Sequence, residues 1–205
     1  VDEWNVWYRT IGELDGGWQV APPLLEEVYD LADALVVAQY LMAFLRHADV
    51  VKVANIAQVA NVIAPLLTRG DDLLLQTTYH AFRMISDRRD GTSLRIGHDG
   101  PTFPTTHGTA TVVDAAVVAD PDALHLIAVN RSTTQAAPVE LHVPGVALGA
   151  VRSAELLTGS APDAANSWEV PGAVVPVAFD EVRISGDRAV AEIPPHSLLA
   201  VTIGR

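Results

Sequence analysis

Cysteine is absent from this chain of 205 residues, which excludes disulfide bonds, thiolate catalysis and cysteine-ligated zinc or iron–sulfur centres. Basic residues are also few: 13 Lys and Arg stand against 25 Asp and Glu, giving a formal net charge of −12. Nucleic-acid-binding proteins neutralise phosphates with clustered Lys and Arg. The charge balance therefore argues against a nucleic-acid partner.

Long hydrophobic runs are missing as well. The longest apolar stretch, residues 34–45, is shorter than the ~20 residues of a transmembrane helix and is interrupted by Gln39, so we expect no membrane partner. The chain opens at Val1 without a basic and apolar leader, so we expect a piece of a longer polypeptide or a chain that has lost a segment. The lack of cysteine and of a leader favours a cytoplasmic location.

The first ninety residues follow an alternating strand and helix pattern. Apolar positions of residues 31–45 recur at three- and four-residue spacing, typical of one helical face, with Asp30 as a candidate N-cap. The β-branched run 50–54 predicts a strand buried on both sides, and residues 73–85 predict a second helix. With a strand-like start at residues 1–7, this order predicts two β/α units of a parallel sheet.

Beyond residue 90 the pattern changes to short β-prone runs separated by turn residues, which favours a β-sandwich. The predicted strands are residues 111–119, 124–130, 138–143, 151–157, 174–178, 188–193 and 198–203. A parallel sheet needs several strands and cover on both faces. We therefore expect residues 1–90 to be the end of a larger α/β unit and residues 91–205 to be a β-sandwich domain.

Candidate chemistry is densest at the start of the chain, in the segment VDEWNVWY. In a strand, Glu3, Asn5 and Trp7 share one face, while Asp2 points the other way, into the packing behind the strand. Aromatic faces pack against sugar rings, amides bind hydroxyls, and a carboxylate can attack or stabilise an oxocarbenium-like centre. The alternative is a strand end with a solvated acid and aromatic residues in a core.

Other catalytic patterns are missing. The seven histidines lack metal-site spacing, and there is neither a Gly-x-Ser-x-Gly elbow nor a glycine-rich phosphate loop, so we predict no metal and no cofactor. Residues 9–23 form a predicted long loop, where Trp18 is a candidate either for a sugar platform or for a hydrophobic plug.

Four blocks in order and spacing resemble family 51 of the glycoside hydrolases, the α-L-arabinofuranosidases: residues 2–8 (DEWNVWY), 33–38 (DALVVA), 46–52 (RHADVVK) and 54–65 (ANIAQVANVIAP). Beyond residue 90 the resemblance is looser and runs to the C-terminus. It implies the C-terminal part of a (β/α)8 barrel, residues 1–90 being its last two β/α units, followed by a jelly-roll-like β-sandwich over residues 91–205.

The resemblance also implies roles for particular residues. Glu3 falls on the position of the catalytic nucleophile, Gln58 on a residue that contacts arabinose, and Trp7 on a residue lining the aglycone side of the pocket. Both segments would lie at the C-terminal ends of barrel strands, where barrel active sites are built. Asn5 shares the face of Glu3 and either orients Glu3 or a substrate hydroxyl, or satisfies loop backbone.

Retention of configuration requires two carboxyl groups ~5 to 5.5 Å apart, and only Glu3 has a motif here. The resemblance places the acid/base glutamate in an N-terminal barrel portion, or a companion chain, that this sequence lacks. The implied activity is release of terminal α-L-arabinofuranosyl groups from arabinose-containing saccharides, in a homo-oligomer. The alternatives are a noncatalytic carbohydrate-binding or assembly module and a retaining glycosidase of another barrel family.

Overall fold

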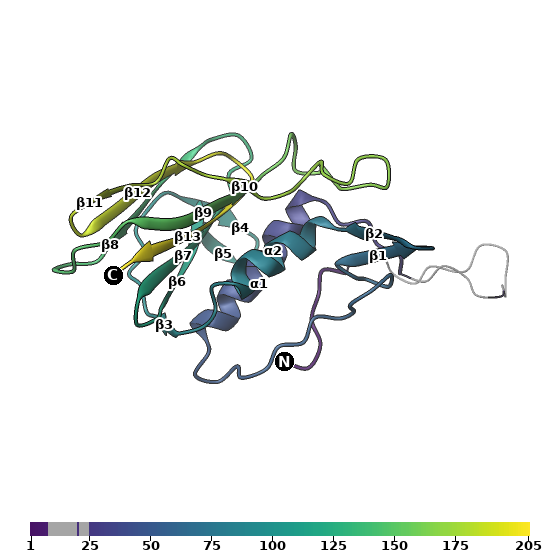
Figure 1. Ribbon diagram of the computed structural model, residues 1–205, viewed down its shortest axis with the longest axis horizontal. Coiled ribbons are helices and arrows are strands. Elements are labelled where there is room, and N and C mark those ends of the chain that lie inside the picture. Colours follow the sequence, from purple (N-terminus) through teal and green to yellow (C-terminus); the bar gives the residue numbers. More distant parts are fainter. Residues whose placement is uncertain (8–19, 21–24) are drawn as a thin grey trace.

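The computed structural model describes residues 1–7, 20 and 25–205, so the predicted loop 9–23 with Trp18 lies outside the described residues except for Val20. Helices and strands alternate at first and strands follow (Figure 1). In chain order the elements are α1 (Leu31–Arg46), β1 (Leu66–Arg69), β2 (Asp72–Leu75), α2 (Thr77–Ser86), β3 (Thr92–Leu94), β4 (Thr102–Thr105), β5 (Gly108–Thr111), β6 (Val113–Ala119), β7 (Ala123–Asn130), β8 (Ala137–His142), β9 (Val151–Leu157), β10 (Val177–Ala178), β11 (Arg183–Ser185), β12 (Arg188–Ile193) and β13 (Ser197–Gly204).

Three layers make up the molecule. A six-stranded sheet of order β10-β9-β13-β7-β6-β3 forms the middle layer, and a three-stranded sheet of order β11-β12-β8 packs on one of its faces. Helices α1 and α2 pack on the other face. Strand β7 is apolar along most of its length because both of its faces are buried. Leu126 and Ala128 pack on the side of the small sheet, whereas Ile127 and Val129 pack on the side of the helices.

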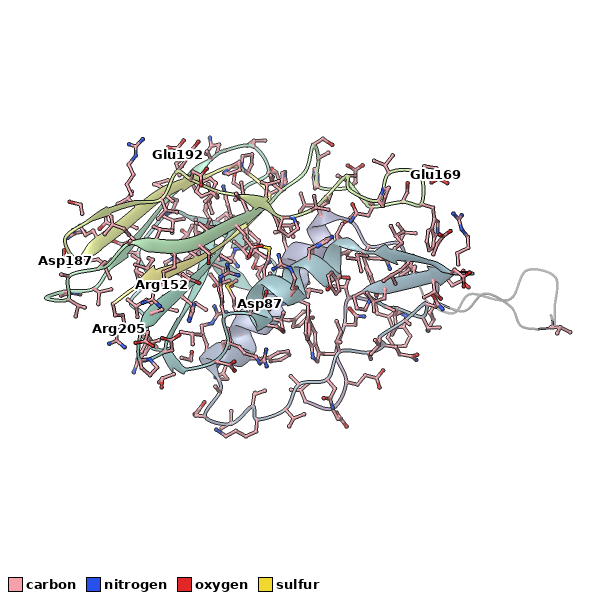
Figure 2. All side chains as sticks on the ribbon, viewed as in Figure 1. Asp87, Arg152, Glu169, Asp187, Glu192 and Arg205 are labelled. Carbon is pink, nitrogen blue, oxygen red and sulfur yellow. The ribbon has the colours of Figure 1, made fainter. Side chains whose placement is uncertain are left out.

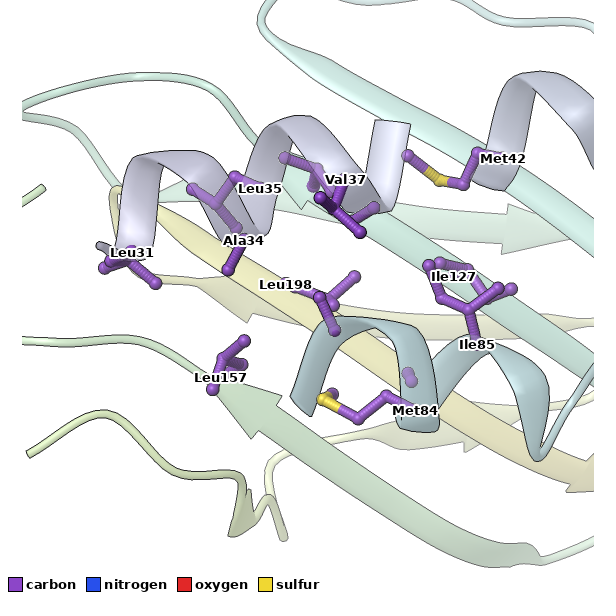
Figure 3. Close-up of a cluster of buried hydrophobic side chains, with 14 of the residues drawn as sticks. Leu31, Ala34, Leu35, Val37, Met42, Met84, Ile85, Ile127, Leu157 and Leu198 are labelled. Atoms are coloured by element: carbon purple, nitrogen blue, oxygen red, sulfur yellow. The ribbon is translucent and has the colours of Figure 1, made fainter. Parts of the chain in front are cut away.

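Helix α1 forms as the sequence predicts, and Asp30 is its N-cap. The Asp30 carboxylate accepts a hydrogen bond from the Asp33 backbone at 3.0 Å, and the Asp33 carboxylate accepts one from the Asp30 backbone at 3.0 Å. This reciprocal capping box satisfies backbone donors that a helix start leaves free. The apolar stripe of α1 then packs against α2 and the middle sheet (Figure 3).

Two expectations for the first ninety residues are corrected. The strand predicted over residues 50–54 is not formed, and Val50 and Val53 are 73% and 60% exposed. A parallel strand is stable only between neighbouring strands, and in the described part of the chain this stretch is hydrogen-bonded to a neighbouring extended segment on one side, at Val1. The second helix begins at Thr77 rather than at residue 73, because the three leucines before it pair with β1 in a hairpin that turns at Gly70.

The predicted sandwich strands form, with one substantial change. The run 174–178 contributes only the two residues of β10, since Val174 is held instead by the side chain of Asn166. The sequence did not predict four short strands after residue 90: β3, β4, β11 and, apart from its last residue, β5. Each has three or four residues, too few for an alternating pattern to stand out.

An ion-pair cluster joins α2 to the middle sheet. Glu155 on β9 accepts hydrogen bonds from Arg83 at 2.6 Å and from the buried Arg88 at 2.9 Å. Desolvation raises the pKa of Glu155, but the hydrogen bonds and charges of the two guanidinium groups outweigh it and hold that pKa below its ordinary value. The cluster therefore favours the folded state most strongly when Glu155 is ionised.

We expect Glu155→Gln in the full-length protein to lower the free energy of unfolding by about 1 to 3 kcal/mol at neutral pH, because Arg88 loses its charged partner while buried. The difference from wild type should be full above the ordinary glutamate pKa of ~4.3 and should shrink as pH falls through the lowered folded-state pKa. Urea denaturation at several pH values measures it. Glu140→Gln, which breaks an exposed pair with Arg188, is the control, and an equal loss there would contradict the prediction.

Candidate functional site

The first segment of the chain lies beside residues 53–57 and runs parallel to them. The Trp4 backbone donates to the Asn55 carbonyl at 3.2 Å, and the Ala57 backbone donates to the Trp4 carbonyl at 3.0 Å. Trp4 and Ile56 form a parallel bridge. Since both segments run the same way, the residues that follow each of them meet at one end, which brings the Glu3 segment next to the loop that begins at Gln58.

Burial alternates along this first segment. Trp4 is 8% exposed and packs with Val6 into the core below α1 and α2, whereas Glu3 and Trp7 are exposed. The predicted shared face of Glu3, Asn5 and Trp7 is therefore the face turned away from the helices. Asp2, which we expected to point into the packing, is exposed instead, because the apolar cluster covers that face only from Trp4 onward.

Asn5 connects the two segments. Its side-chain nitrogen donates to the carbonyls of Ala57, at 2.5 Å, and Ile63, and its side-chain oxygen accepts from the Val6 backbone at 2.8 Å. These carbonyls flank Gln58 on both sides. Both N–H groups of the amide are thus used by backbone, which favours a positioning role for Asn5 over direct contact with a substrate.

Gln58 opens a tight, exposed turn. Its backbone N–H donates to the Ile63 carbonyl at 3.2 Å, and the peptide bond between Ala57 and Gln58 is cis. Asn61 and Ile63 adopt positive φ angles of 65° and 40°, which fold the loop back on itself. The Gln58 side chain itself is exposed, on the loop adjoining the Glu3 segment.

A buried polar network supports both segments from behind. The Tyr29 hydroxyl donates to the Val6 carbonyl at 2.8 Å, and the Tyr29 backbone donates to the side chain of Gln76 at 2.8 Å. The Gln76 amide then donates to the carbonyls of Ala64 at 2.7 Å and Glu27 at 3.1 Å. Sequence reasoning missed Gln76 and Tyr29, and a lone glutamine before a helix carries no signal that could have found it.

The site is an open surface. Two cavities of about 640 and 630 Å³ in the described part of the chain lie between the end of α1 and β3 and beside β8, and neither is lined by Glu3 or Gln58. Over the same residues no group of three His, Asp or Glu side chains is arranged to hold a metal ion. No helix in the described part of the chain is long and apolar enough to cross a bilayer.

Comparison with known proteins identifies the family. Residues 2–197 match the family model described as the α-L-arabinofuranosidase C-terminal domain. An intracellular exo-α-(1→5)-L-arabinofuranosidase of Streptomyces lividans is 40% identical over 204 residues, covering 96% of this chain and 30% of that protein. The chain therefore belongs to the α-L-arabinofuranosidase C-terminal domain family.

Solved structures agree with this assignment. The family 51 arabinofuranosidase of Xanthomonas axonopodis pv. citri superposes with a TM-score of 0.86 at 32% identity, over 99% of this chain and 40% of that one. The Thermotoga maritima α-L-arabinofuranosidase in complex with arabinose gives 0.83 at 25% identity, over 100% and 42%. The expected fold class, the C-terminal part of a (β/α)8 barrel followed by a β-sandwich, is confirmed. The chain spans about a third of the length of the curated relatives it matches.

Gln76→Glu should destabilise the full-length protein by about 1 to 3 kcal/mol, because a buried carboxylate cannot donate to the carbonyls of Ala64 and Glu27. Thermal unfolding measures the change. Gln135→Glu, the same substitution at an exposed position, serves as the control and should shift the melting temperature little. Equal melting temperatures for the two variants would show that the network does not support the site.

Proposed function

We propose that the protein containing this chain is a retaining glycoside hydrolase that releases terminal α-L-arabinofuranosyl groups, with Glu3 as its nucleophile. The single observation that carries the proposal is the parallel pairing of the two segments, which sets Glu3 and Gln58 on adjacent, outward-facing stretches of chain. In this proposal Gln58 binds the arabinose and Trp7, 54% exposed on the face of Glu3, lines the side where the leaving group departs.

The reaction needs a second carboxyl group. Glu3 attacks the anomeric carbon to form a glycosyl-enzyme intermediate, while an acid ~5 to 5.5 Å away protonates the leaving oxygen and then activates water. We assign that acid to the N-terminal barrel portion, which would also complete the open face around Glu3. Residues 1–90 would then be the last two β/α units of the barrel and residues 91–205 the sandwich. The end of α2 at Ser86 and the start of β3 at Thr92 support this boundary.

The activities of named relatives support a substrate and a location. The Streptomyces lividans relative is described as intracellular and as acting on α-(1→5) linkages. We therefore propose α-1,5-linked arabino-oligosaccharides as substrates and the cell interior as the location. The proposal includes a homo-oligomer, which the family resemblance implies and which sedimentation of the full-length protein would test.

Glu3→Gln in the full-length protein should reduce turnover of an aryl α-L-arabinofuranoside by roughly 10⁴-fold or more, the scale of loss when a nucleophile is removed. Folding should be intact, because Glu3 is exposed. The matched control is Asp2→Asn, a neighbouring exposed carboxylate outside the proposed site, whose rate should stay within about threefold of wild type. Near-normal turnover by Glu3→Gln would remove Glu3 from the mechanism.

A further inference from the structure

A long connection without regular strands or helices joins β9 to β10. It covers residues 158–176, beyond the ~12–15 residues at which irregular loops become uncommon and are usually functional or disordered. This loop is fixed to the start of α1: the Leu31 and Ala32 backbones donate to the carbonyls of Ala164 and Pro162, both at 2.9 Å. The loop therefore extends from the sandwich past the start of α1 toward the β1–β2 hairpin (Figure 1).

Asn166 fastens the same loop to the β1–β2 hairpin. Its buried side chain donates to the carbonyls of Leu75 and Val174, both at 3.0 Å, and accepts from the Val174 backbone at 2.8 Å. The next residues turn sharply, with the Val170 backbone donating to the Ser167 hydroxyl at 3.1 Å. Trp168 and Glu169 are the two residues presented by this turn, and Figure 2 shows Glu169 above the hairpin.

The β1–β2 hairpin places a basic side chain against the Trp168 ring. Arg69, at the end of β1, places its guanidinium 4.4 Å from the centre of the Trp168 ring. Arg69 and Glu169 are exposed, and Trp168 is half-buried. Because Asn166 already holds the loop to the hairpin from the buried side, the pair of Arg69 and Trp168 is not needed to fasten them together.

The hairpin is continuous with the Gln58 loop. The Asn61 backbone donates to the Leu66 carbonyl at 2.8 Å, and the Asn61 side chain accepts from the Thr68 backbone at 2.8 Å. Thr68 is the residue before Arg69. A short, hydrogen-bonded stretch of backbone therefore connects Arg69, and with it Trp168 and Glu169, to the loop of Gln58, the residue proposed to bind arabinose.

We propose that Arg69, Trp168 and Glu169 form a distal subsite that binds the oligosaccharide chain beyond the sugar that is released; this inference rests on the proposed function. An indole packs against the C–H face of a sugar, a guanidinium offers five N–H donors to hydroxyls, and a carboxylate accepts from them. Because the loop and hairpin are ordered by their own backbone contacts, binding there costs little conformational entropy. The ligand class is a neutral arabino-oligosaccharide of several units.

The test compares a long substrate with a short one in the full-length protein. The ratio of kcat/KM for α-1,5-arabinotetraose to kcat/KM for an aryl α-L-arabinofuranoside should fall roughly three- to tenfold in Trp168→Ala, the scale of one lost aromatic contact. Trp168→Phe should restore part of the ratio. The matched control is Phe103→Ala on β4, which removes the ring of another cation–π pair, with Arg131 at 5.7 Å, and should leave the ratio unchanged.

The outcomes separate this inference from the proposed function. An unchanged ratio in Trp168→Ala, or an equal fall in Phe103→Ala, would overturn the subsite. If the wild-type protein hydrolyses neither substrate, the proposed function fails, and calorimetric titration with arabinotetraose then decides the subsite by itself. Weaker binding by Trp168→Ala than by wild type would support it, whereas equal binding, or none to the wild type, would refute it.

Discussion

The apolar layer between the two helices and the middle sheet is the contact on which the rest of the structure depends. Side chains of α1 and α2 meet Ile127, Leu157 and Leu198 of the sheet in one continuous cluster (Figure 3). Trp4 belongs to the same cluster and contacts Phe44 of α1 and Phe82 of α2, so the segment that carries Glu3 packs on helices that the sheet supports. The sandwich is therefore part of the structural support of the candidate site, because removing it would expose the buried faces of both helices.

Packing sets where the first segment lies, and polar contacts set its register. Apolar burial is non-directional, so it cannot decide how far one segment is shifted along its neighbour. The amide of Asn5, the hydroxyl of Tyr29 and the side chain of Gln76 make that decision through hydrogen bonds to specific carbonyls. Leaving any of these buried carbonyls unpaired is costly, which keeps the Gln58 loop in one position relative to Glu3.

Much of the fold could be predicted from local pattern. Helix α1 combines a capping residue with helical spacing, so two local signals agreed there. Residues 73–75 carry a single local signal, a short apolar run, which fits a helix or a strand equally well. Pairing with β1 makes this run a strand. The strand expected over residues 50–54 failed for a different reason, because a parallel strand depends on neighbours that no local pattern supplies.

Some residues of the candidate sites could likewise be predicted from local sequence, and others depend on tertiary packing. Glu3, Trp7 and Gln58 could be proposed because each lies in a short contiguous block that resembles the family, and alternation along the first block predicts a shared face for Glu3 and Trp7. Arg69 and Trp168 could not, because they lie 99 positions apart in the sequence and come together through contacts such as that of the buried Asn166 with Leu75. Functional residues that lie together in one segment can be predicted from the sequence. A site assembled from a hairpin and a distant loop forms only when the sheet and helices are packed. In this chain the same apolar layer that seats Glu3 also fixes the position of that loop, since Leu31 of α1 both packs in the layer and donates to the loop carbonyl of Ala164.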